Sequence, residues 1–326
     1  MGLQPAALAQ LTRGGVVEST HLGAVAVADA DGTVVGRLGD IDALVYPRSA
    51  LKPFQALATT SLLARAAPDP VGLAVACASH TGSDDAQIEA AHLLAVAGLD
   101  ESALRCPPAW PADPATLRTT TEPSRLAHNC SGKHAAFLWA HTAGGGEPER
   151  YLDPGCPLQT RVREVLAAVT GAAPTGPAVD GCGAPAWRLP LVRLAAGYAR
   201  LAAAHGGAPL AAVRAAMTAR PDLVGGAGCA DTALMASDRR VVAKRGAEGV
   251  LAAGMPTSRG PVGVAVKVAD GAGRAAVPPV AAVLRALGAT VPGALLRTPL
   301  PPGGAPARAW LEPAPRLVDW AAETGM

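Results

Sequence analysis

Aromatic side chains are scarce in this sequence: Phe, Tyr and Trp together make up 3% of its 326 residues. Charged residues are also sparse, at 17%, whereas half of the residues are hydrophobic. Ala, Val and Leu must therefore supply most of the apolar surface, so the core depends on close approach of small side chains rather than on aromatic anchors. A chain of this length is sufficient for one large domain or for two intermixed subdomains.

A strong excess of charge is missing too. The formal net charge is +2, and the densest basic spots are the pairs Arg239-Arg240 and Lys244-Arg245. Nucleic-acid binding needs a larger basic surface than two such pairs. We therefore expect no nucleic-acid partner.

Neither a secretion signal nor a long apolar run is evident. The first 13 residues lack a basic segment followed by an apolar one. The apolar stretch 189–204 is interrupted by Arg193 and Arg200, so it falls short of the roughly 18 residues that a membrane span needs. We expect a cytoplasmic protein without a membrane partner, whose cysteines are reduced thiols. The six cysteines are Cys77, Cys106, Cys130, Cys156, Cys182 and Cys229.

Strand signals lie at both ends of the chain and helix signals in its middle. Apolar runs at 22–28 and 33–38 flank an Asp-Gly pair, which is a hairpin signal. We expect further strands at 71–78, 178–180, 231–235, 240–244, 249–253 and 263–268. Helices are expected at 49–66, 84–97, 133–142, 159–169, 190–204, 210–219 and 279–287.

This order predicts an α/β fold in which an antiparallel sheet takes strands from the N- and C-terminal parts and a mostly helical insertion separates them. No composition shift or internal repeat divides the chain, so we expect a single domain over residues 1–326. Residues 106–125 hold five prolines and are expected to form a long loop. The Pro/Gly-rich residues 292–308 are expected to be a loosely held tail, within a Pro-rich C-terminal part at 290–326.

Ser49 and Lys52 form a Ser-x-x-Lys motif that could carry chemistry. In a helical first turn the two side chains share a face. An amine whose pKa is lowered by burial or by a cationic neighbour can take the serine proton and create a nucleophile. The short motif occurs by chance in many chains, but here Pro53 and Phe54 extend it. The longer string resembles the nucleophile motif of penicillin-binding proteins and serine β-lactamases.

Residues 128–134 read His-Asn-Cys-Ser-Gly-Lys-His and gather a thiol, a hydroxyl, an amine and two imidazoles. The Gly-Lys pair lacks the glycine spacing and the Ser/Thr of a phosphate loop, which excludes that motif. Cys130 is either a small buried hydrophobe or, together with Cys182, a metal ligand. Two thiolates with a nitrogen ligand and a water would make an open tetrahedral zinc site. We expect this segment to meet the Gly-rich turn at 180–183 in space.

Asp180 and Lys267 each allow two interpretations. Asp180 lies two residues before Cys182, so in an extended chain both side chains point the same way; alternatively it only hydrogen-bonds the Gly-rich turn. Lys267 interrupts the apolar run 264–268. A buried lysine is costly unless it is paired or functional, but an edge strand could also expose it to solvent.

Three other polar residues occupy positions where chains turn. Ser79 and His80 follow the strand expected at 71–78 and precede the helix at 84–97, a place where catalytic groups often lie. Glu248 lies in the tight turn 246–249 and is either a hairpin charge or a substrate contact.

The order of these motifs resembles that of the Rhizobium etli-type L-asparaginases, the class 3 or asparaginase II family, over roughly residues 10–288. The strings that carry the resemblance are Arg48-Ser49-x-x-Lys52-Pro53, Ala78-Ser79-His80-Thr81-Gly82, residues 128–134, Asp180-Gly181-Cys182-Gly183, Asp231-Thr232, Gly246-Ala247-Glu248-Gly249, and Lys267 with Asp270-Gly271. Residues 128–134 and 180–183 are together the most specific of them. Cys229 departs from the family, where a polar or basic residue is more usual.

The resemblance implies a fold like that of the serine β-lactamases and glutaminases, a homodimer, and hydrolysis of L-asparagine to L-aspartate and ammonia. It implies two hydroxyl–amine pairs, Ser49 with Lys52 and Ser79 with Lys267, of which we expect Ser49 to be the nucleophile. It also implies that Zn²⁺ is held with a water by three side chains. These expected metal ligands are Cys130, Lys133 and Cys182. The expected substrate-binding residues are Arg48, His80, His134, Asp180 and Glu248.

Two other functions are compatible with the same residues. One is a metal-free Ser-x-x-Lys acyl hydrolase that acts on glutamine or on a β-lactam-like ring. The other is a zinc-stabilised binding domain without catalysis. Metal content separates the first alternative from a zinc-dependent asparaginase, and the absence of amide hydrolysis would identify the second.

Overall fold

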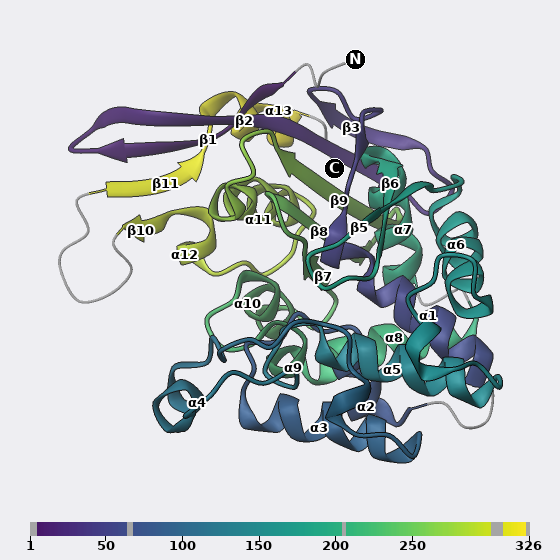
Figure 1. The fold of residues 1–326 in the computed structure, drawn as a ribbon. Helices are drawn as coiled ribbons and strands as arrows, with labels where there is room; N and C mark the ends of the chain where they lie inside the picture. Colours follow the sequence, from purple (N-terminus) through teal and green to yellow (C-terminus); the bar gives the residue numbers. More distant parts are fainter. Residues whose placement is uncertain (1–4, 64–67, 204–206, 301–308, 324–326) are drawn as a thin grey trace. The chain divides into compact units, whose positions relative to one another are not determined.

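The computed structural model describes residues 5–63, 68–203, 207–300 and 309–323. Its packing divides the chain into two compact units (Figure 1). Unit 1 comprises Met1–Ala50, Leu189–Ala203 and Ala233–Met326, and unit 2 comprises Leu51–Arg188 and Ala204–Thr232. The single domain expected over residues 1–326 stays a prediction.

Unit 1 is built on an antiparallel sheet of eight described strands. They are β1 (Ala6–Arg13), β2 (Val16–Asp29), β3 (Val34–Leu38), β7 (Val242–Arg245), β8 (Val250–Thr257), β9 (Gly260–Val268), β10 (Thr298–Leu300) and β11 (Ala309–Pro313). Their order is β10-β11-β1-β2-β9-β8-β7, with β3 beside β2. The predicted fold class, with an antiparallel sheet drawn from both ends of the chain, is confirmed.

The predicted hairpin at Asp29–Gly32 joins β2 to β3. The carboxylate of Asp29 accepts hydrogen bonds from the backbone N–H groups of Asp31 and Thr33, at 2.9 and 2.8 Å. Gly32 has a φ of +91°, which the missing Cβ permits. These local contacts form the turn between the two strands. In the resulting register of β2 and β3, Val25 pairs with Leu38.

Both faces of the central strands are covered. Residues 24–28 of β2 are all fully buried, and because alternate side chains point to opposite faces, neither face is left to solvent. Helix α7 (Leu191–Ala203) packs against β2, β8 and β9, and α11 (Val277–Ala286) packs against β1, β8, β9 and β11. A Cβ added to Gly263 would lie 2.0 Å from the carbonyl oxygen of Ala195, so α7 approaches the sheet closely only because this residue is glycine.

The described residues of the expected tail, 292–300, are not loosely held, and residues 309–323 pack within unit 1. Helix α12 (Gly293–Leu296) leads into β10, β11 pairs with β1, and α13 (Pro315–Glu323) packs beside β1 and α11. Buried Leu311 and Leu317 explain this order, because each adds apolar area to the core. The proline content of the segment does not show that these contacts form. Residues 301–308 of the expected tail lie outside the described residues.

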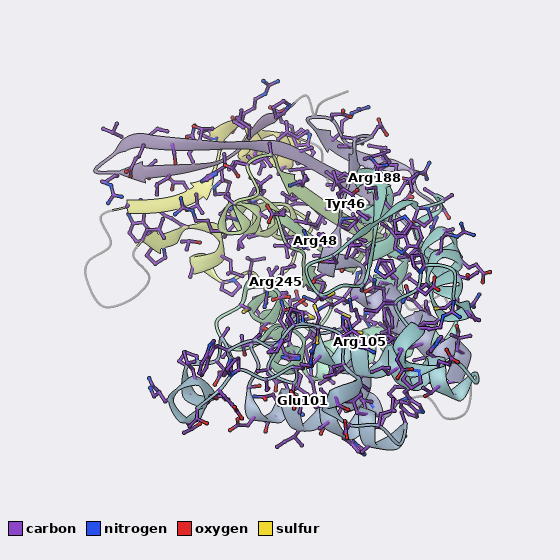
Figure 2. All side chains as sticks on the ribbon, viewed as in Figure 1. Tyr46, Arg48, Glu101, Arg105, Arg188 and Arg245 are labelled. Atoms are coloured by element: carbon purple, nitrogen blue, oxygen red, sulfur yellow. The ribbon has the colours of Figure 1, made fainter. Side chains whose placement is uncertain are left out.

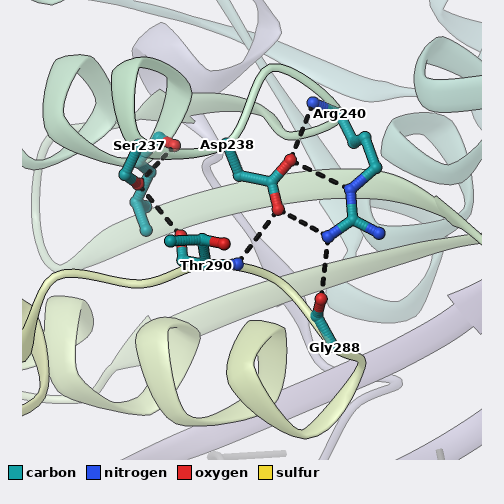
Figure 3. A network of polar contacts seen from close by, with 6 residues as sticks. Ser237, Asp238, Arg240, Gly288 and Thr290 are labelled. Atoms are coloured by element: carbon teal, nitrogen blue, oxygen red, sulfur yellow. Dashed lines mark hydrogen bonds and ion pairs between the residues drawn. The ribbon is translucent and has the colours of Figure 1, made fainter.

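A polar clip holds the segment after α11 in unit 1 (Figure 3). The Asp238 carboxylate pairs with the Arg240 guanidinium at 2.6 Å and accepts the Thr290 backbone N–H at 3.0 Å. Arg240 also donates to the carbonyl of Gly288 at 2.7 Å. These contacts lower the pKa of Asp238 to about 2, and the largest cause is the hydrogen bond from Arg240.

Unit 2 is mostly helical. Its described helices of five residues or more are α1 (Lys52–Leu63), α2 (Pro70–Ala76), α3 (Asp84–Val96), α4 (Pro114–Thr119), α5 (Ser131–Ala143), α6 (Pro157–Thr170), α8 (Ala208–Ala219) and α9 (Pro221–Gly225). Helix α5 contacts α1, α2, α3 and α6, so it lies at the centre of the unit. β5 (Thr175–Val179) pairs with β6 (Pro185–Pro190) and carries the turn at 180–183.

The strand expected at 71–78 is wrong: residues 71–76 lie in α2 (Pro70–Ala76). Asp69 caps the helix by accepting the Gly72 backbone N–H at 2.8 Å, and Pro70 occupies its first turn. Residues 72–76 are all buried, so the segment carries no polar face that would reveal a helical period.

Three other expectations at the level of elements need correction. Residues 231–235 lie in helix α10 (Ala230–Ser237) and not in a strand, because a short apolar run does not distinguish the two. The expected loop at 106–125 contains α4, which Asp113 caps. The helix expected from residue 49 begins as a 3-10 turn (Arg48–Leu51) before α1, and residues 64–66 lie outside the described residues. Among the residues described, no helix is long and apolar enough to cross a membrane.

Candidate active site

Lys52 is the buried centre of the polar cluster in unit 2. It begins α1 and is 1% exposed. Its ammonium group donates to the Ser79 hydroxyl at 3.0 Å, to the Asn129 carbonyl at 3.2 Å and to the Ala78 carbonyl. Burial lowers the pKa of Lys52, although the nearby Cys130 thiolate opposes the shift. The residue is therefore an amine next to a hydroxyl in a site that favours the neutral amine.

Ser79 and His80 are held just after α2. The backbone N–H of Ser79 donates to the Val224 carbonyl at 2.9 Å. Nδ1 of His80 accepts the Gly82 N–H at 3.0 Å, so its ring proton lies on Nε2, which is 3.0 Å from the Ser131 hydroxyl. A neutral His80 thus links the turn after Ser79 to the first residue of α5.

The two cysteine-bearing segments meet, as the sequence predicted. Cys130 is the residue before α5, and Lys133 lies in the first turn of that helix. The Lys133 ammonium is 3.1 Å from the sulfur of Cys182, which the turn after β5 carries. The Cys130 sulfur is also 3.3 Å from the amide oxygen of Asn129. All three predicted metal ligands are therefore neighbours in unit 2.

Charge balance explains how these groups are buried together. Lys52, Lys133, Cys130 and Cys182 are each at most 7% exposed. Hydrogen bonding with Cys182 lowers the pKa of Cys130 well below its usual value, and Lys52 and Lys133 add to the effect. Burial disfavours the charged form of Lys133, but Cys182 and Cys130 outweigh it and raise the pKa of Lys133 to about 12. The ammonium group of Lys133 and the thiolate of Cys130 thus compensate one another in the buried cluster.

Asp180 contributes to the turn and to the charge of the cluster. Its carboxylate accepts the Gly181 N–H at 2.6 Å, and its backbone N–H donates to the Ala184 carbonyl at 2.9 Å. Its charge also favours the ammonium form of Lys133. The local hydrogen bond considered from the sequence is therefore present, together with an electrostatic link to the cluster.

The donor set in unit 2 is suited to a thiophilic metal only if Lys133 takes part. Among the described residues, no three Cys, His, Asp or Glu side chains gather closely enough to hold a metal ion. Cys130 and Cys182 are two soft ligands, and the Lys133 amine is a nitrogen donor 3.1 Å from Cys182. The raised pKa of Lys133 means that a metal would have to displace its proton.

Tyr151 is a member of the site that the sequence reasoning missed. It is fully buried, and its hydroxyl is 2.6 Å from Nδ1 of His134 and 2.9 Å from the backbone nitrogen of Arg105, which Figure 2 labels. No motif marks it, because it lies in an irregular segment 17 residues after His134. Burial, followed by Lys133, lowers the pKa of His134 to about 4.

The predicted residues of unit 1 gather around two strained backbone positions. Arg48, labelled in Figure 2, has a φ of +54° and Glu248 one of +57°; no other non-glycine residue in the described ranges has a positive φ. A Cβ at Gly246 would lie 2.3 Å from the Pro47 carbonyl oxygen, so the turn 246–249 packs directly on this segment. Such conformations cost roughly 1–3 kcal/mol and concentrate at functional sites.

Lys267 is tied to the same turn. Its ammonium donates to the carbonyls of Glu248 at 2.5 Å and Val268 at 2.9 Å. Burial lowers its pKa, while Glu248 and Asp270 oppose the shift. The two expected pairs, Ser49 with Lys52 and Ser79 with Lys267, join residues of different units and stay predictions.

A separate cavity of about 500 Å³ opens at the C-terminal end of α5. His141, Glu147, Arg150 and Asp153 are among its lining residues. None of the predicted site residues lines it, so it is distinct from the cluster around Lys52.

One known family matches most of this sequence. The sequence profile described as L-asparaginase II matches residues 9–299, most of the chain. The chain belongs to the L-asparaginase II family. No curated protein matches this L-asparaginase II member. Family membership supports an amidohydrolase.

Among solved structures, this L-asparaginase II member is similar to a protein called Mglu. In its native form, Mglu is 16% identical over 78% of this chain and 61% of its own, with a TM-score of 0.44. A second crystal structure of Mglu is 17% identical over 78% of this chain and 64% of its own, with a TM-score of 0.45. The chain thus spans less than two thirds of Mglu's length.

Proposed function

We propose that this chain hydrolyses L-asparagine to L-aspartate and ammonia, as a member of the Rhizobium etli-type, class 3 branch of its family. The observation that carries the proposal is the hydrogen bond of 3.0 Å between the Lys52 amine and the Ser79 hydroxyl in a buried site. An amine with a lowered pKa is a suitable general base for a serine.

In the proposed mechanism Ser49 attacks the side-chain amide carbon of asparagine while Lys52 takes the hydroxyl proton. The C–N bond then breaks, and the protonated lysine returns a proton to the departing ammonia. Water hydrolyses the resulting ester, which releases aspartate and restores the serine. The contact of Lys52 with Ser79 also makes Ser79 a candidate for the nucleophile, with Lys267 as its expected second amine.

The proposed substrate-binding groups are charged side chains and imidazoles. Arg48 would pair with the α-carboxylate, since a guanidinium binds a carboxylate through two parallel hydrogen bonds. Glu248 and Asp180 would pair with the α-ammonium group. His80 and His134 would orient the amide by hydrogen bonds.

We further propose that Cys130, Lys133 and Cys182 hold Zn²⁺. Two thiolates and one amine leave a fourth position open, and when bound the ion would supply Lewis-acid polarisation or a template for the substrate. We also propose that the protein is a cytoplasmic homodimer, which sedimentation equilibrium would test.

The decisive experiment measures ammonia release from L-asparagine and L-glutamine by the purified full chain. We expect activity on asparagine, and a loss of at least about 10³-fold in kcat for the variant that lacks the nucleophile. Ser49→Ala and Ser79→Ala are compared for this purpose. Near-normal activity of Ser49→Ala would move the nucleophile to Ser79, and absence of activity on both amides would reject the proposal.

Metal analysis of the same protein tests the zinc proposal. Zinc should be close to one per chain and should disappear in Cys130→Ser and in Cys182→Ser. A metal-free protein that hydrolyses glutamine would instead favour the Ser-x-x-Lys acyl hydrolase. Zinc without any hydrolysis would favour a zinc-stabilised binding domain.

A further inference from the structure

His21 and Asp270 form a hydrogen-bonded pair in unit 1 that joins β2 to the segment after β9. Nδ1 of His21 lies 2.7 Å from Oδ2 of Asp270, although the two residues are 249 positions apart in the sequence. His21 is 7% exposed, whereas the Asp270 side chain is half exposed. Neither residue takes part in the proposed mechanism, so the buried imidazole needs a separate explanation.

The partners of Asp270 assign the proton of this pair. Burial favours the neutral carboxyl, but the backbone N–H of Ala272 and the ring of His21 outweigh it and lower the pKa of Asp270. The carboxylate accepts the Ala272 N–H through Oδ1, at 2.8 Å, and is an acceptor at Oδ2 as well. Nδ1 of His21 is therefore the donor, and both carboxylate oxygens are held.

β2 holds the segment after β9 through both backbone and side chain. The backbone N–H of Ala269 donates to the Leu22 carbonyl at 2.8 Å, one residue beyond the end of β9 at Val268. Asp270 follows in a turn. The His21 side chain therefore adds a contact from β2 to the turn itself.

This segment carries Lys267 and packs on the turn that holds Glu248. The Lys267 ammonium donates to the carbonyls of Glu248 and Val268, at 2.5 and 2.9 Å. The Val268 N–H donates to the Gly249 carbonyl at 2.9 Å. A Cβ at Gly271 would lie 2.6 Å from a carboxylate oxygen of Glu248, so the two turns are in direct contact. A shift of the segment would move the groups that surround the Lys267 amine.

Charge adds to this geometry. Burial lowers the pKa of Lys267, and Glu248 and Asp270 oppose the shift. The distance between the amine and the Asp270 carboxylate therefore influences how readily Lys267 is protonated. His21 limits how far this half-exposed carboxylate can move.

We infer that His21 is a positioning residue, which holds the Asp270 carboxylate and thereby fixes the segment 267–271 and the Lys267 amine. The part that Lys267 plays in catalysis rests on the proposed function. The hydrogen bond between His21 and Asp270 does not.

Two variants of His21 separate its hydrogen bond from its bulk. Asn places an amide N–H near the position of Nδ1, whereas Gln places one near Nε2, where the described residues offer no partner. For asparagine, kcat should fall about 5- to 20-fold in His21→Gln and stay within about threefold in His21→Asn. His92→Gln is the matched control, because it removes an exposed imidazole of α3 that lies 3.8 Å from the Glu89 carboxylate, and should leave kcat unchanged.

The reactivity of the Lys267 amine gives a measurement that does not depend on catalysis. The sequence has four lysines, and Lys52, Lys133 and Lys244 are at most 3% exposed. A short pulse of acetic anhydride followed by peptide mass spectrometry therefore reports on Lys267. Its acetylation should be about 3- to 10-fold faster in His21→Gln than in the unmodified protein, because the segment opens more often. His21→Asn should resemble the unmodified protein.

Asp270→Ala gives a second route if His21→Gln does not fold. The Asp270 side chain is half exposed, so its truncation leaves little empty space in the core. It should lower kcat and speed the acetylation of Lys267 as His21→Gln does. Where both variants fold, the double variant should lose no more activity than the more damaging single one, because both remove the same contact.

Each outcome decides a part of the inference. Equal losses in His21→Gln and His21→Asn, additive losses with Asp270→Ala, or an unchanged acetylation rate of Lys267 would overturn it. Faster acetylation with an unchanged kcat would overturn the link to catalysis. If no amide is hydrolysed, the proposed function fails while acetylation still tests the role of His21.

Discussion

Four buried ionisable residues make the cluster in unit 2 sensitive to the loss of any one of them. Lys133 is 3% exposed and has the Cys182 sulfur at 3.1 Å. Removing one partner of a buried pair leaves an uncompensated charge, whereas replacing both can be close to neutral. The balance of charge, rather than either residue alone, should therefore determine stability here.

This argument gives a double-mutant prediction. Cys182→Ala should lower the free energy of unfolding of chelator-treated protein by about 3–5 kcal/mol, because the buried ammonium group of Lys133 loses the sulfur that lies 3.1 Å away. Adding Lys133→Met should restore much of that loss. Urea titration followed by circular dichroism measures both changes. Additive losses in the double variant would show that the two residues are not coupled.

At the scale of residues, side chains that belong to sequence motifs could be predicted as members of the site. Side chains outside such motifs could not. Cys130 and Cys182 were expected to meet because each lies in a dense polar string, and they do. Lys52 was expected next to Ser49, and within unit 2 it donates to the hydroxyl of Ser79 as well as to two backbone carbonyls. Tyr151 could not be foreseen, because the contact of a loop side chain with His134 depends on packing over the whole unit.

Close approach between α7 and the sheet of unit 1 depends on glycine. The Cβ of an alanine at Gly263 would meet backbone atoms of Ala195 and Ala199, at 2.0 and 2.6 Å. Gly263→Ala should therefore destabilise the protein by about 1–3 kcal/mol or more, since α7 would have to move away from the sheet. Thermal unfolding measures the effect.

Gly273→Ala serves as the control for this substitution. Gly273 is exposed, has no atom within 4 Å of the position of an added Cβ, and belongs to the same unit. Its replacement should change the free energy of unfolding by less than about 0.5 kcal/mol. Equal effects at the two glycines would contradict a close contact between α7 and β9.

The clip around Asp238 predicts a dependence of stability on pH. The pKa of Asp238 is about 2 in the folded protein, below the usual 3.8, so its stabilisation is fully present above pH 4 and is lost as the pH falls towards 2. Arg240 is half exposed, and solvent screening limits the effect to about 1–2 kcal/mol. The free energy of unfolding of Asp238→Asn should lack this part of the acid dependence. If the free energies of unfolding of the unmodified protein and of Asp238→Asn changed in parallel between pH 4 and 2.5, the role of Asp238 in acid sensitivity would be refuted.

Elements were predictable where local chemistry determines them. The turn between β2 and β3 is formed by local contacts of Asp29 and by the positive φ of Gly32. For residues 71–78 the predicted strand was wrong, because a short segment that is buried on all sides has no polar face to reveal a helical period. Only the capping role of Asp69 distinguishes a helix from a strand there. The same ambiguity affected residues 231–235.

The whole sheet of unit 1 depends on strands from distant parts of the sequence. β1 lies between β2 and β11, and its Leu8 and Leu11 are buried. Deleting residues 297–326 would remove β10, β11 and α13 and expose an apolar edge strand. We expect a shorter chain of this kind to lose its cooperative thermal transition and to aggregate, as light scattering would show. An unchanged transition would mean that β11 contributes nothing to stability.

This arrangement of strands also has a consequence for synthesis. β1 and β2 leave the ribosome early, but β9, which pairs with β2, ends at Val268, and β11 ends at Pro313. At a rate of synthesis of roughly 5–20 residues per second, β9 and β11 are completed on the order of ten to fifty seconds after the hairpin of β1 and β2. During that interval its apolar faces and strand edges are open to chaperones and to other nascent chains. Slower translation should therefore lower the yield of folded protein, and chaperones that bind the first 40 residues should raise it.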